Sequence, residues 1–492
     1  MQQFKKIRNI HFIGIGGSGM IGIATILHKK GYSISGSDIS KTKDLDELAK
    51  SGVDVTYSHK SKNINNKDLI VLSSAIDSSN VEVSSAKKKN IPIIPRAEML
   101  SGISRGYQGI AVAGSHGKTT TTSLIAHIFN QALLSPTYVI GGKILSSDGN
   151  SRLGDGNFFI FEADESDKSF LSFYPDSAVI TNIDDDHLEA YEGNINNLKK
   201  SFLDFSDNIP FFGYVIANYD DKNTRDILKK IKRRVITFGL NKKSDITVSE
   251  INYFFDYVDF KIYIKDTNKK HKFRLSLQGK YNIYNAVAAI AVAIEEGISI
   301  QTIRAALKSF SGVERRLERF KLIIKNKQVT HIDDYGHHPK EIEQVIVSLR
   351  RHFKKKKVLM IFQPHRFSRT KMLFKDFIST LSKVDKVFLL PIYSASEKEI
   401  KGVSSKNMAQ KLNTINGKDF CSLVKHENVN DMVEQCIDKY DVVITQGAGN
   451  VSMVSKGLIK KWKICKKSVY SMEVILPKER FHLKAVNLFI NL

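Results

Sequence analysis

Residues 110–120 read IAVAGSHGKTT, a short apolar run that leads through a glycine loop into a segment with a helical pattern. A strand, loop and helix in this order direct backbone N–H groups and the positive end of the helix dipole at one point, where phosphate oxygens bind. Lys118 could reach the β- and γ-phosphates of a nucleotide, and the Thr119 hydroxyl could bind Mg²⁺. The loop departs from the usual pattern because Val112 stands where the first glycine is expected. The residues predicted to hold a nucleoside triphosphate are Gly114, Ser115, His116, Gly117, Lys118, Thr119 and Thr120.

A second glycine loop lies near the N-terminus, directly after another apolar run. Its spacing is G-x-G-x-x-G, and Asp38 ends the next predicted strand, where it could accept hydrogen bonds from ribose hydroxyls. Because a separate triphosphate loop follows later in the chain, the pattern favours UDP or a similar nucleotide over NAD. A tight turn without a ligand is the alternative. The residues predicted to form this site are Gly14, Gly16, Gly17, Ser18, Gly19 and Asp38.

Strand-like and helix-like segments alternate along most of the chain, which has 492 residues and a hydrophobic content of 42%. This length is typical of about three domains, and the alternation predicts parallel sheets with helices on their faces. Between residues 245 and 277 the apolar residues recur at every second position, which predicts antiparallel strands. A Gly/Ser-rich stretch near 101–109 and a very polar stretch near 313–320 mark the boundaries. We predict an α/β fold with domains at residues 1–107, 108–314 and 315–464, and a tail at 465–492 that no pattern assigns.

Polar residues follow several of the predicted strands. An acidic run begins at Glu162, and residues 182–187 (NIDDDH) follow the next strand. Because the carboxyl ends of parallel strands share one edge of a sheet, we expect these carboxylates near the phosphate loop as Mg²⁺ ligands; a solvated acidic turn is the alternative. We predict that His187 has a metal or phosphate role. In the third domain two polar loops also follow strands, and there Arg366 and Arg369 could clamp a carboxylate or phosphate.

The chain is strongly basic, with 75 Lys and Arg against 51 Asp and Glu, and a net charge of +24. Such a charge suggests a nucleic-acid or membrane-surface partner, and a basic P-loop protein that binds nucleic acid is the alternative from a different class. The surplus is mostly lysine spread along the sequence, which favours solvated faces. The sequence shows no long apolar stretch, no secretory signal pattern and only three cysteines. We therefore expect a cytoplasmic protein with neither nucleic-acid binding nor membrane insertion.

Taken in order, these motifs resemble those of the Mur ligase family over roughly residues 9–462. The resemblance includes HFIGIGGSGM at 11–20, both glycine loops, the acidic runs and QGAGN at 446–450. It implies a UDP-binding Rossmann-like domain, a central ATPase domain and a C-terminal Rossmann-like domain. The N-terminal signature is most similar to that of family members that join L-alanine to UDP-N-acetylmuramic acid. A muropeptide-recycling ligase, which joins a tripeptide to the same nucleotide sugar, is the alternative within the class.

The resemblance also implies ligands and residue roles. ATP and Mg²⁺ would be the cofactors, UDP-N-acetylmuramate and L-alanine the other substrates, an acyl phosphate the intermediate, and a monomer or weak homodimer the assembly. Tyr281 departs from the family, which usually has histidine at that position. The implied catalytic residues are Lys118, His187, Arg366 and Arg369, and the implied metal ligands are Thr119, Glu162 and His187. The nucleotide would also meet Asn282, Asn285 and Asp334, and the UDP-sugar Ser73, Ser74 and Arg96. The muramyl group and the amino acid would meet Arg316, Tyr335, His337, His365, Arg366 and Arg369.

Overall fold

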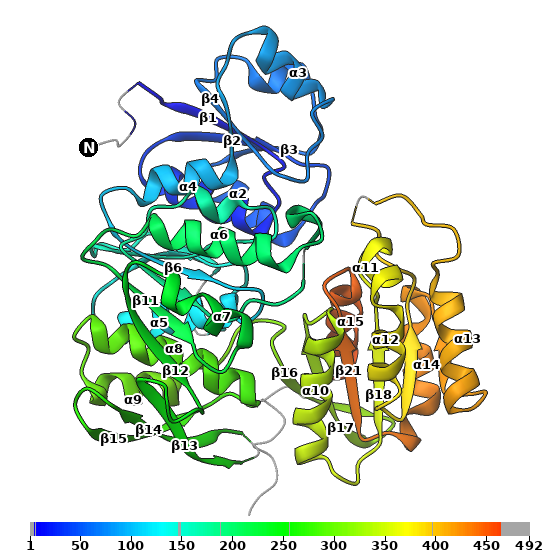
Figure 1. Cartoon of the computed structure of the whole chain (residues 1–492). Helices are drawn as coiled ribbons and strands as arrows, with labels where there is room; N and C mark the ends of the chain where they lie inside the picture. Colours follow the sequence, from blue (N-terminus) through cyan, green and yellow to red (C-terminus); the bar gives the residue numbers. More distant parts are fainter. Residues whose placement is uncertain are drawn as a thin grey trace, which may run out of the picture.

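The computed structural model describes residues 4, 6–145, 149–186, 188–254, 256–395 and 397–463, and the backbone alone of Ser18. These residues form three α/β domains, each built around its own β-sheet (Figure 1). The predicted fold class is therefore confirmed. His187 and the tail at 465–492 lie outside the described residues. Within the described ranges, no helix has both the length and the apolar character that a membrane span requires.

The N-terminal domain has a parallel sheet in the order β3-β2-β1-β4-β5. Its strands are β1 (Asn9–Ile13), β2 (Ser33–Ser37), β3 (Asp54–Thr56), β4 (Leu69–Leu72) and β5 (Ile93–Pro95). Its helices are α1 (Ser18–Lys29), α2 (Lys43–Lys50), η1 (Ser61–Ile64), α3 (Val81–Lys88) and α4 (Arg96–Ser104). Most side chains of β1 and β4 are buried and apolar, as expected for strands covered on both faces, and His11 is a buried polar exception in β1. The strand order reverses between β1 and β4, which is where ligands bind in sheets of this kind.

The central domain has a sheet in the order β15-β14-β13-β12-β11-β10-β6-β9-β7-β8. Its strands are β6 (Gln108–Ala113), β7 (Thr137–Val139), β8 (Ser151–Arg152), β9 (Phe158–Glu162), β10 (Ser177–Ile180), β11 (Tyr214–Asn218), β12 (Arg234–Gly239), β13 (Ile246–Tyr253), β14 (Val258–Ile264) and β15 (Lys269–Leu275). Its helices are α5 (Lys118–Gln131), η2 (Ser169–Ser172), η3 (Leu188–Tyr191), α6 (Ile195–Asp207), α7 (Lys222–Ile227), η4 (Leu228–Lys230), α8 (Lys280–Glu295) and α9 (Ile300–Ser309). Strands β13, β14 and β15 are antiparallel, as predicted. The parallel strands β10, β6 and β9 are neighbours, so their carboxyl ends share one edge.

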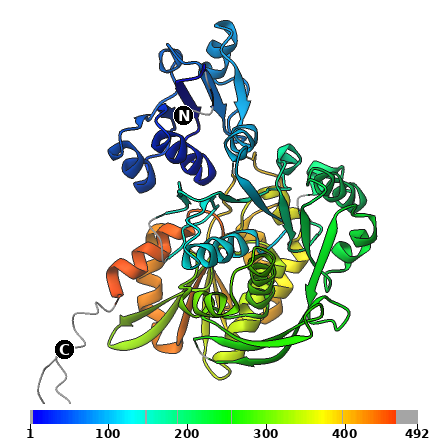
Figure 2. The ribbon, with the colours of Figure 1, turned by 90° about the vertical axis from the view of Figure 1, so that its left-hand side faces the viewer.

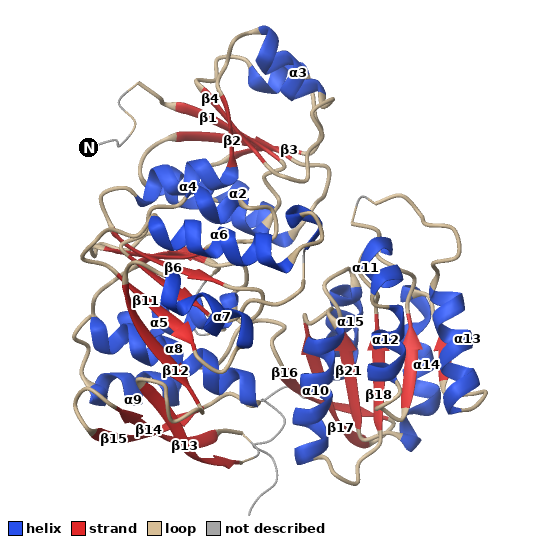
Figure 3. Ribbon diagram, viewed as in Figure 1, coloured by secondary structure: helices blue, strands red, loops and turns tan. Residues whose placement is uncertain are grey.

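The C-terminal domain has a sheet in the order β16-β17-β21-β18-β19-β20, in which only the β16–β17 pair is antiparallel. Its strands are β16 (Glu318–Ile324), β17 (Lys327–Asp334), β18 (Val358–Phe362), β19 (Lys386–Leu389), β20 (Cys421–Leu423) and β21 (Val442–Gln446). Its helices are α10 (Pro339–His352), α11 (Phe367–Met372), α12 (Phe374–Leu381), α13 (Ser405–Asn416), η5 (His426–Asn428), α14 (Val429–Cys436), η6 (Ile437–Lys439) and α15 (Val451–Trp462). Helices α10, α12 and α13 cover one face of the sheet, and α14 and α15 cover the other (Figure 3).

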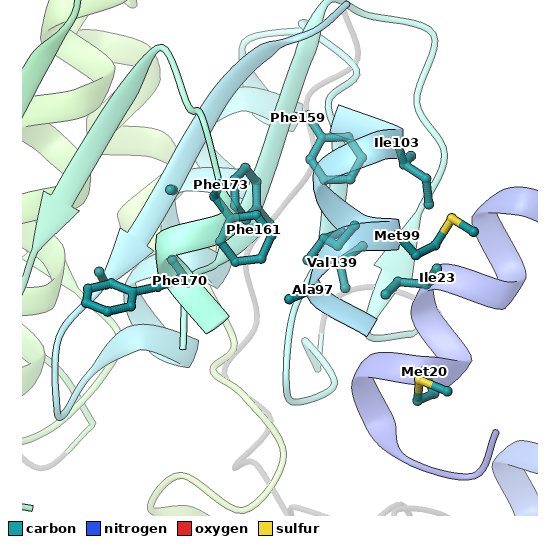
Figure 4. Packing of buried hydrophobic residues seen from close by; sticks show 14 of the residues in the cluster. Met20, Ile23, Ala97, Met99, Ile103, Val139, Phe159, Phe161, Phe170 and Phe173 are labelled. Atoms are coloured by element: carbon teal, nitrogen blue, oxygen red, sulfur yellow. The ribbon is translucent and has the colours of Figure 1, made fainter. Parts of the chain in front are cut away.

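The N-terminal and central domains share one apolar core. A single cluster of buried side chains includes Met20 and Ile23 of α1, Met99 of α4, and Phe159 and Phe161 of β9 (Figure 4). Burial of apolar surface across a domain boundary favours a fixed contact between the two domains. Figure 2 shows the N-terminal domain (blue) at one end of the molecule.

The C-terminal domain has two apolar clusters of its own, one on each face of its sheet. The segment that connects the central domain to the C-terminal domain is hydrogen-bonded to both. The Glu314 N–H donates a hydrogen bond to the Lys143 carbonyl of the central domain (2.8 Å), whereas the Arg315 carbonyl accepts one from the Tyr335 N–H of the C-terminal domain (2.7 Å). Two consecutive residues are thus bound to different domains.

Candidate active site

The phosphate loop, residues 114–120, joins β6 to the first turn of α5. Gly114 and Gly117 have φ angles of +127° and +86°, which glycine adopts without strain. A Cβ atom on Gly114 would lie 2.1 Å from Thr181 Oγ1, and one on Gly117 would lie 2.4 Å from Asn285 Oδ1. The loop is so closely enclosed that its shape depends on both glycines.

The Lys118 ammonium group is bound by protein oxygens in this structure. Its Nζ atom donates to the Gly114 carbonyl (2.8 Å) and to Glu165 Oε2 (2.7 Å), and Asp164 Oδ1 lies 3.8 Å away. Burial opposes the charged form, but the charges of Glu165 and Asp164 outweigh it and hold the pKa of Lys118 above its ordinary value. Lys118 is therefore a buried cation at the N-terminus of α5, where phosphate groups bind.

Glu165 is a functional candidate that the sequence reasoning missed. Its side chain is fully buried, and its Oε1 atom has no hydrogen-bond partner among the described residues. Burial raises the pKa of Glu165 to about 7 although the Lys118 charge favours the carboxylate. Buried groups with such pKa values beside a binding loop cluster at functional sites. Several acids stand close together in this run, so the sequence pattern could not single out the buried one.

The two oxygen groups expected to bind Mg²⁺ lie together at the end of β9. Thr119 Oγ1 donates to Glu162 Oε2 (3.2 Å), and the Gly141 N–H donates to Glu162 Oε1 (2.6 Å). Burial raises the pKa of Glu162 against the opposing Gly141 hydrogen bond and Lys118 charge. Mg²⁺ commonly takes one or two protein oxygens together with phosphate oxygens and water, so this pair fits the ion. Among the residues that the structure describes, no group of three or more His, Cys, Asp and Glu side chains could hold a metal.

Residues 182–186 follow β10 and lie against the phosphate loop. Asn182 Oδ1 accepts the His116 N–H, and Asn182 Nδ2 donates to the His116 carbonyl, both at 2.9 Å. The Asp184 N–H donates to Ser115 Oγ at the same distance. The structure thus brings the second acidic run to the phosphate loop, as the order of strands predicts.

A cavity of about 590 Å³ opens beside the phosphate loop, between the central and C-terminal domains. Its size is within the range of small-molecule sites. Tyr281 lines it with a side chain that is about half exposed, and Asn285 Nδ2 donates to Asn282 Oδ1 (3.2 Å) in its wall. The predicted site residues that line this cavity are His116, Gly117, Thr120, Asn282, Asn285, Arg316 and Asp334.

The two polar loops of the C-terminal domain meet at one edge of its sheet. The His337 ring centroid lies 5.6 Å from that of Tyr335, which follows the same strand, and 5.3 Å from that of His365, which follows β18. The Arg316 guanidinium lies 5.0 Å from the Tyr335 ring centroid. Burial lowers the pKa of His337 to about 3, so this imidazole is neutral near pH 7. Arg366 is exposed at the start of α11.

Arg369 lies close enough to this edge for its charge to help lower the pKa of His337, but its own side chain is buried. Its Nη2 atom lies 3.4 Å from Asp186 Oδ1 of the central domain, and each of the two side chains is only 6% exposed. The sequence groups Arg369 with Arg366 as a ligand clamp. In this structure Arg369 contributes a buried ion pair to the contact between two domains, and its ligand role stays a prediction.

The second glycine loop follows β1 at the switch point of the N-terminal sheet. Gly14 has a φ angle of +78°, and a Cβ atom on it would lie 2.9 Å from the Ser73 Cβ. The Gly16 N–H donates to Asp38 Oδ2 (2.8 Å), so Asp38 supports the loop directly. A Cβ atom on Gly19 would lie 3.2 Å from Arg96 Nη1. The structure thus brings these predicted residues together, with Gly17 in the same loop and the exposed Ser74 following Ser73.

The sequence also gives no sign of a buried carboxylate, Glu82, that lies close to this loop. Glu82 of α3 accepts hydrogen bonds from Ser37 Oγ (2.5 Å), His59 Nδ1 (2.8 Å) and Asn63 Nδ2 (2.6 Å). Burial opposes ionisation, but the hydrogen bonds to the carboxylate outweigh it and lower the pKa of Glu82 to about 2. The Ser37 carbonyl in turn accepts the Gly14 N–H (2.8 Å). Glu82 therefore fixes the strand end that supports the glycine loop.

Three domains, a phosphate loop with a buried lysine, and a cavity between the second and third domains define the class of protein. Residues 9–108 match the family described as "Mur ligase family, catalytic domain", residues 112–293 match "Mur ligase middle domain", and residues 315–449 match "Mur ligase, glutamate ligase domain". The chain belongs to the Mur ligase family.

Relatives with assigned names show which members of the Mur ligase family this chain resembles. The UDP-N-acetylmuramate–L-alanine ligase of Ruthia magnifica subsp. Calyptogena magnifica is 45% identical over 450 residues, which cover 91% of this chain and 96% of the relative. The enzyme of the same name from Psychrobacter cryohalolentis is 42% identical and covers 92% of this chain and 94% of its own length. The crystal structure of UDP-N-acetylmuramate–alanine ligase from Thermotoga maritima is similar with a TM-score of 0.79 and 27% identity, over 92% of this chain and 98% of that chain.

Proposed function

We propose that this protein joins L-alanine to UDP-N-acetylmuramate, with ATP and Mg²⁺, in the synthesis of a peptidoglycan precursor. The observation that carries the proposal is the buried Lys118 cation beside the Thr119–Glu162 pair, at a cavity shared by two domains. The two relatives that align over 450 and 454 residues, at 45% and 42% identity, carry this activity in their names.

The reaction has two steps. The muramyl carboxylate attacks the γ-phosphorus of ATP, ADP leaves and an acyl phosphate forms. The amine of alanine then attacks the acyl carbon, phosphate leaves and the amide bond forms. In the first step Lys118 exchanges Glu165 for a γ-phosphate oxygen and stabilises the charge on the transferring group. Thr119, Glu162 and, in the predicted site, His187 would hold Mg²⁺, which when bound would supply positive charge to neutralise the phosphates.

The remaining site residues bind and orient the substrates. Asn282, Asn285 and Asp334 face the nucleotide from the cavity wall, and Tyr281 covers it in place of the usual histidine. Arg316 and Arg366, with the neutral His337 and with Tyr335 and His365, orient the muramyl carboxylate and the incoming amino acid. Arg369 belongs to the same set, facing the muramyl group and the amino acid, and its pair with Asp186 also links the two domains. The UDP-sugar binds at Gly14, Gly16, Gly17, Ser18, Gly19, Asp38, Ser73, Ser74 and Arg96.

The proposal includes domain limits at residues 1–107, 108–314 and 315–464. Support for the second limit comes from the opposite hydrogen bonds of Glu314 and Arg315, which bind different domains. A cytoplasmic location and a monomer or weak homodimer complete the proposal.

The test is phosphate release by purified protein with UDP-N-acetylmuramate, ATP and Mg²⁺. We expect release to depend on L-alanine. The same assay with the tripeptide L-alanyl-γ-D-glutamyl-meso-diaminopimelate as acceptor distinguishes the recycling ligase. Release without any dependence on the amino acid, or faster release with the tripeptide, would contradict the proposal.

A further inference from the structure

The side chain of His116 lies between two carboxylates that belong to different domains. Its Nε2 atom is 3.2 Å from Asp184 Oδ2 of the central domain, and its Nδ1 atom is 3.4 Å from Glu341 Oε1 of α10 in the C-terminal domain. The three side chains are between 16% and 22% exposed. Only the protonated imidazole can donate from both nitrogens, so this arrangement selects the imidazolium. Burial opposes that charge, but hydrogen bonds to Asp184 and Glu341 outweigh it and raise the pKa of His116 to about 10.

Glu341 is itself rigidly placed. Its Oε2 atom accepts the N–H groups of His337 (2.9 Å) and His338 (3.1 Å), and with His338 it forms the capping box of α10. His337 also lies against Tyr335 and His365, and these three rings form a cluster at the edge of the C-terminal sheet. One carboxylate therefore connects the helix N-terminus, this ring cluster and the phosphate loop.

A second cation reinforces the contact from the C-terminal side. Lys340 Nζ lies 2.5 Å from Asp184 Oδ1 and 2.8 Å from Asp185 Oδ1. Asp184 thus pairs with a cation from each domain, and its backbone N–H is bound to Ser115 of the phosphate loop.

The nature of this interface differs from that on the other side of the central domain. The N-terminal domain shares an apolar core with the central domain, whereas the pairs of His116, Lys340 and Arg369 link the C-terminal domain through charged groups. The pairs of His116 and Lys340 are partly exposed, and such pairs contribute little net free energy in water, so they can separate and re-form. The Arg369–Asp186 pair, in contrast, is buried. The C-terminal domain is the one whose position these pairs control.

We propose that His116 is a positioning residue: its side chain binds the C-terminal domain through Glu341, so that domain closure and the shape of the phosphate loop are coupled. The inference rests on the proposed function in one respect, because it takes the nucleotide to bind at this loop. Coupling between two equilibria is reciprocal. Losing the contact on the C-terminal side therefore weakens nucleotide binding on the central side.

The test is a double-mutant cycle of His116→Gln, Glu341→Gln and the two combined, in the full chain. Calorimetry with a non-hydrolysable ATP analogue and Mg²⁺ gives the Kd, and small-angle scattering gives the radius of gyration. We expect each single variant to raise the Kd about five-fold or more and to enlarge the radius, with the double variant no worse than either. Glu343→Gln is the matched control, because it removes the same charge from the same helix but pairs with Lys383 within its own domain. We expect its Kd within about two-fold of the wild type.

Two results would overturn the inference. One is a Glu341→Gln variant that binds the analogue as the wild type does; the other is a double variant whose Kd change is the product of the two single changes. Should the Glu341→Gln variant unfold because it loses the helix cap, the Kd of Lys340→Gln provides the test. The Lys340 side chain contacts Asp184 across the interface but has no part in the capping box. An unchanged Kd in Lys340→Gln then rejects the coupling. The double-mutant cycle measures nucleotide binding, whereas the alanine-dependent assay measures turnover. Failure of this inference can therefore be distinguished from failure of the proposed function.

Discussion

The Nζ atom of Lys118 lies 2.7 Å from the Oε2 atom of Glu165, so the cation that we propose to bind a phosphate already has a counter-charge within the protein. Binding ATP at this loop then exchanges one anion for another. Such an exchange spares the protein an unpaired buried ammonium group, which is strongly unfavourable. It leaves instead a buried Glu165 without its cation.

Lys118→Ala should reduce alanine-dependent phosphate release by about a hundredfold or more, because it removes a charge that stabilises the transferring phosphoryl group. Lys411→Ala, on the exposed face of α13, serves as the control and should keep normal turnover. The measurement is initial rate at saturating substrates, with thermal unfolding to check the fold. Near-normal turnover in the Lys118 variant would show that the phosphate-loop assignment is wrong.

Glu165→Gln should change the response of the protein to ATP. Without ligand, we expect a lower midpoint of thermal unfolding, because Lys118 loses its nearest counter-charge. With ATP the midpoint should rise by more than in the wild type, because the phosphates then supply the missing charge and no carboxylate is left unpaired. Asp167→Asn, in the exposed part of the same loop, is the control. An equal ATP-induced shift in Glu165→Gln and wild type would rule out the exchange.

Glu162→Gln should raise the Mg²⁺ concentration needed for half-maximal turnover by about tenfold or more, because Mg²⁺ prefers a charged oxygen ligand. Since burial raises the pKa of Glu162, a falling pH should also raise the Mg²⁺ requirement of the wild type as protons compete for the carboxylate. This pH effect should be weaker in the variant. Removing divalent cations with a chelator should stop turnover in both. A variant with an unchanged Mg²⁺ requirement would exclude Glu162 as a ligand.

Glu82→Gln should alter stability against acid. The folded pKa of about 2 lies below the ordinary value of 4.5, so the carboxylate contributes stability that is present above pH 4.5 and lost as pH falls towards 2. This difference corresponds to about 3 kcal/mol. We expect the variant to be less stable at pH 7 and to lose less stability between pH 4.5 and 3, measured by thermal unfolding midpoints. Parallel pH curves for wild type and variant would contradict the assignment.

The sequence predicts the fold well where a short sequence pattern, such as a glycine loop or an alternation of apolar residues, corresponds to one local structure. The strand, loop and helix around Gly114 follow from short-range spacing, and the alternation in β14 reflects a strand with differently buried faces. The polar stretch near 313–320 predicts a boundary, and from Glu318 it also begins the edge strand β16, which composition alone does not indicate. An edge strand tolerates polar side chains because part of it faces water, so its composition resembles that of a linker.

The contacts that complete the site could not be predicted in the same way. Lys118 and Glu165 are 47 positions apart, and Asp186 and Arg369 are 183 positions apart and in different domains. No periodicity links single polar residues on separate loops, because their meeting depends on how whole domains pack. The sequence therefore predicts acids near the phosphate loop and two arginines on a polar loop of the third domain, but not which of these residues pair.

The opposite hydrogen bonds of Glu314 and Arg315 have a mechanical consequence. With neighbouring residues hydrogen-bonded to different domains, this point of the chain can serve as a pivot when the C-terminal domain swings relative to the central one. Side chains next to the pivot, such as Arg316, keep their place at the cavity during the swing. Helix α13, at the outer side of the domain (Figure 1), sweeps the widest arc. Such a swing therefore moves the outer helix most, and it moves least the residues beside the cavity where we propose that the phosphates and the muramyl carboxylate meet.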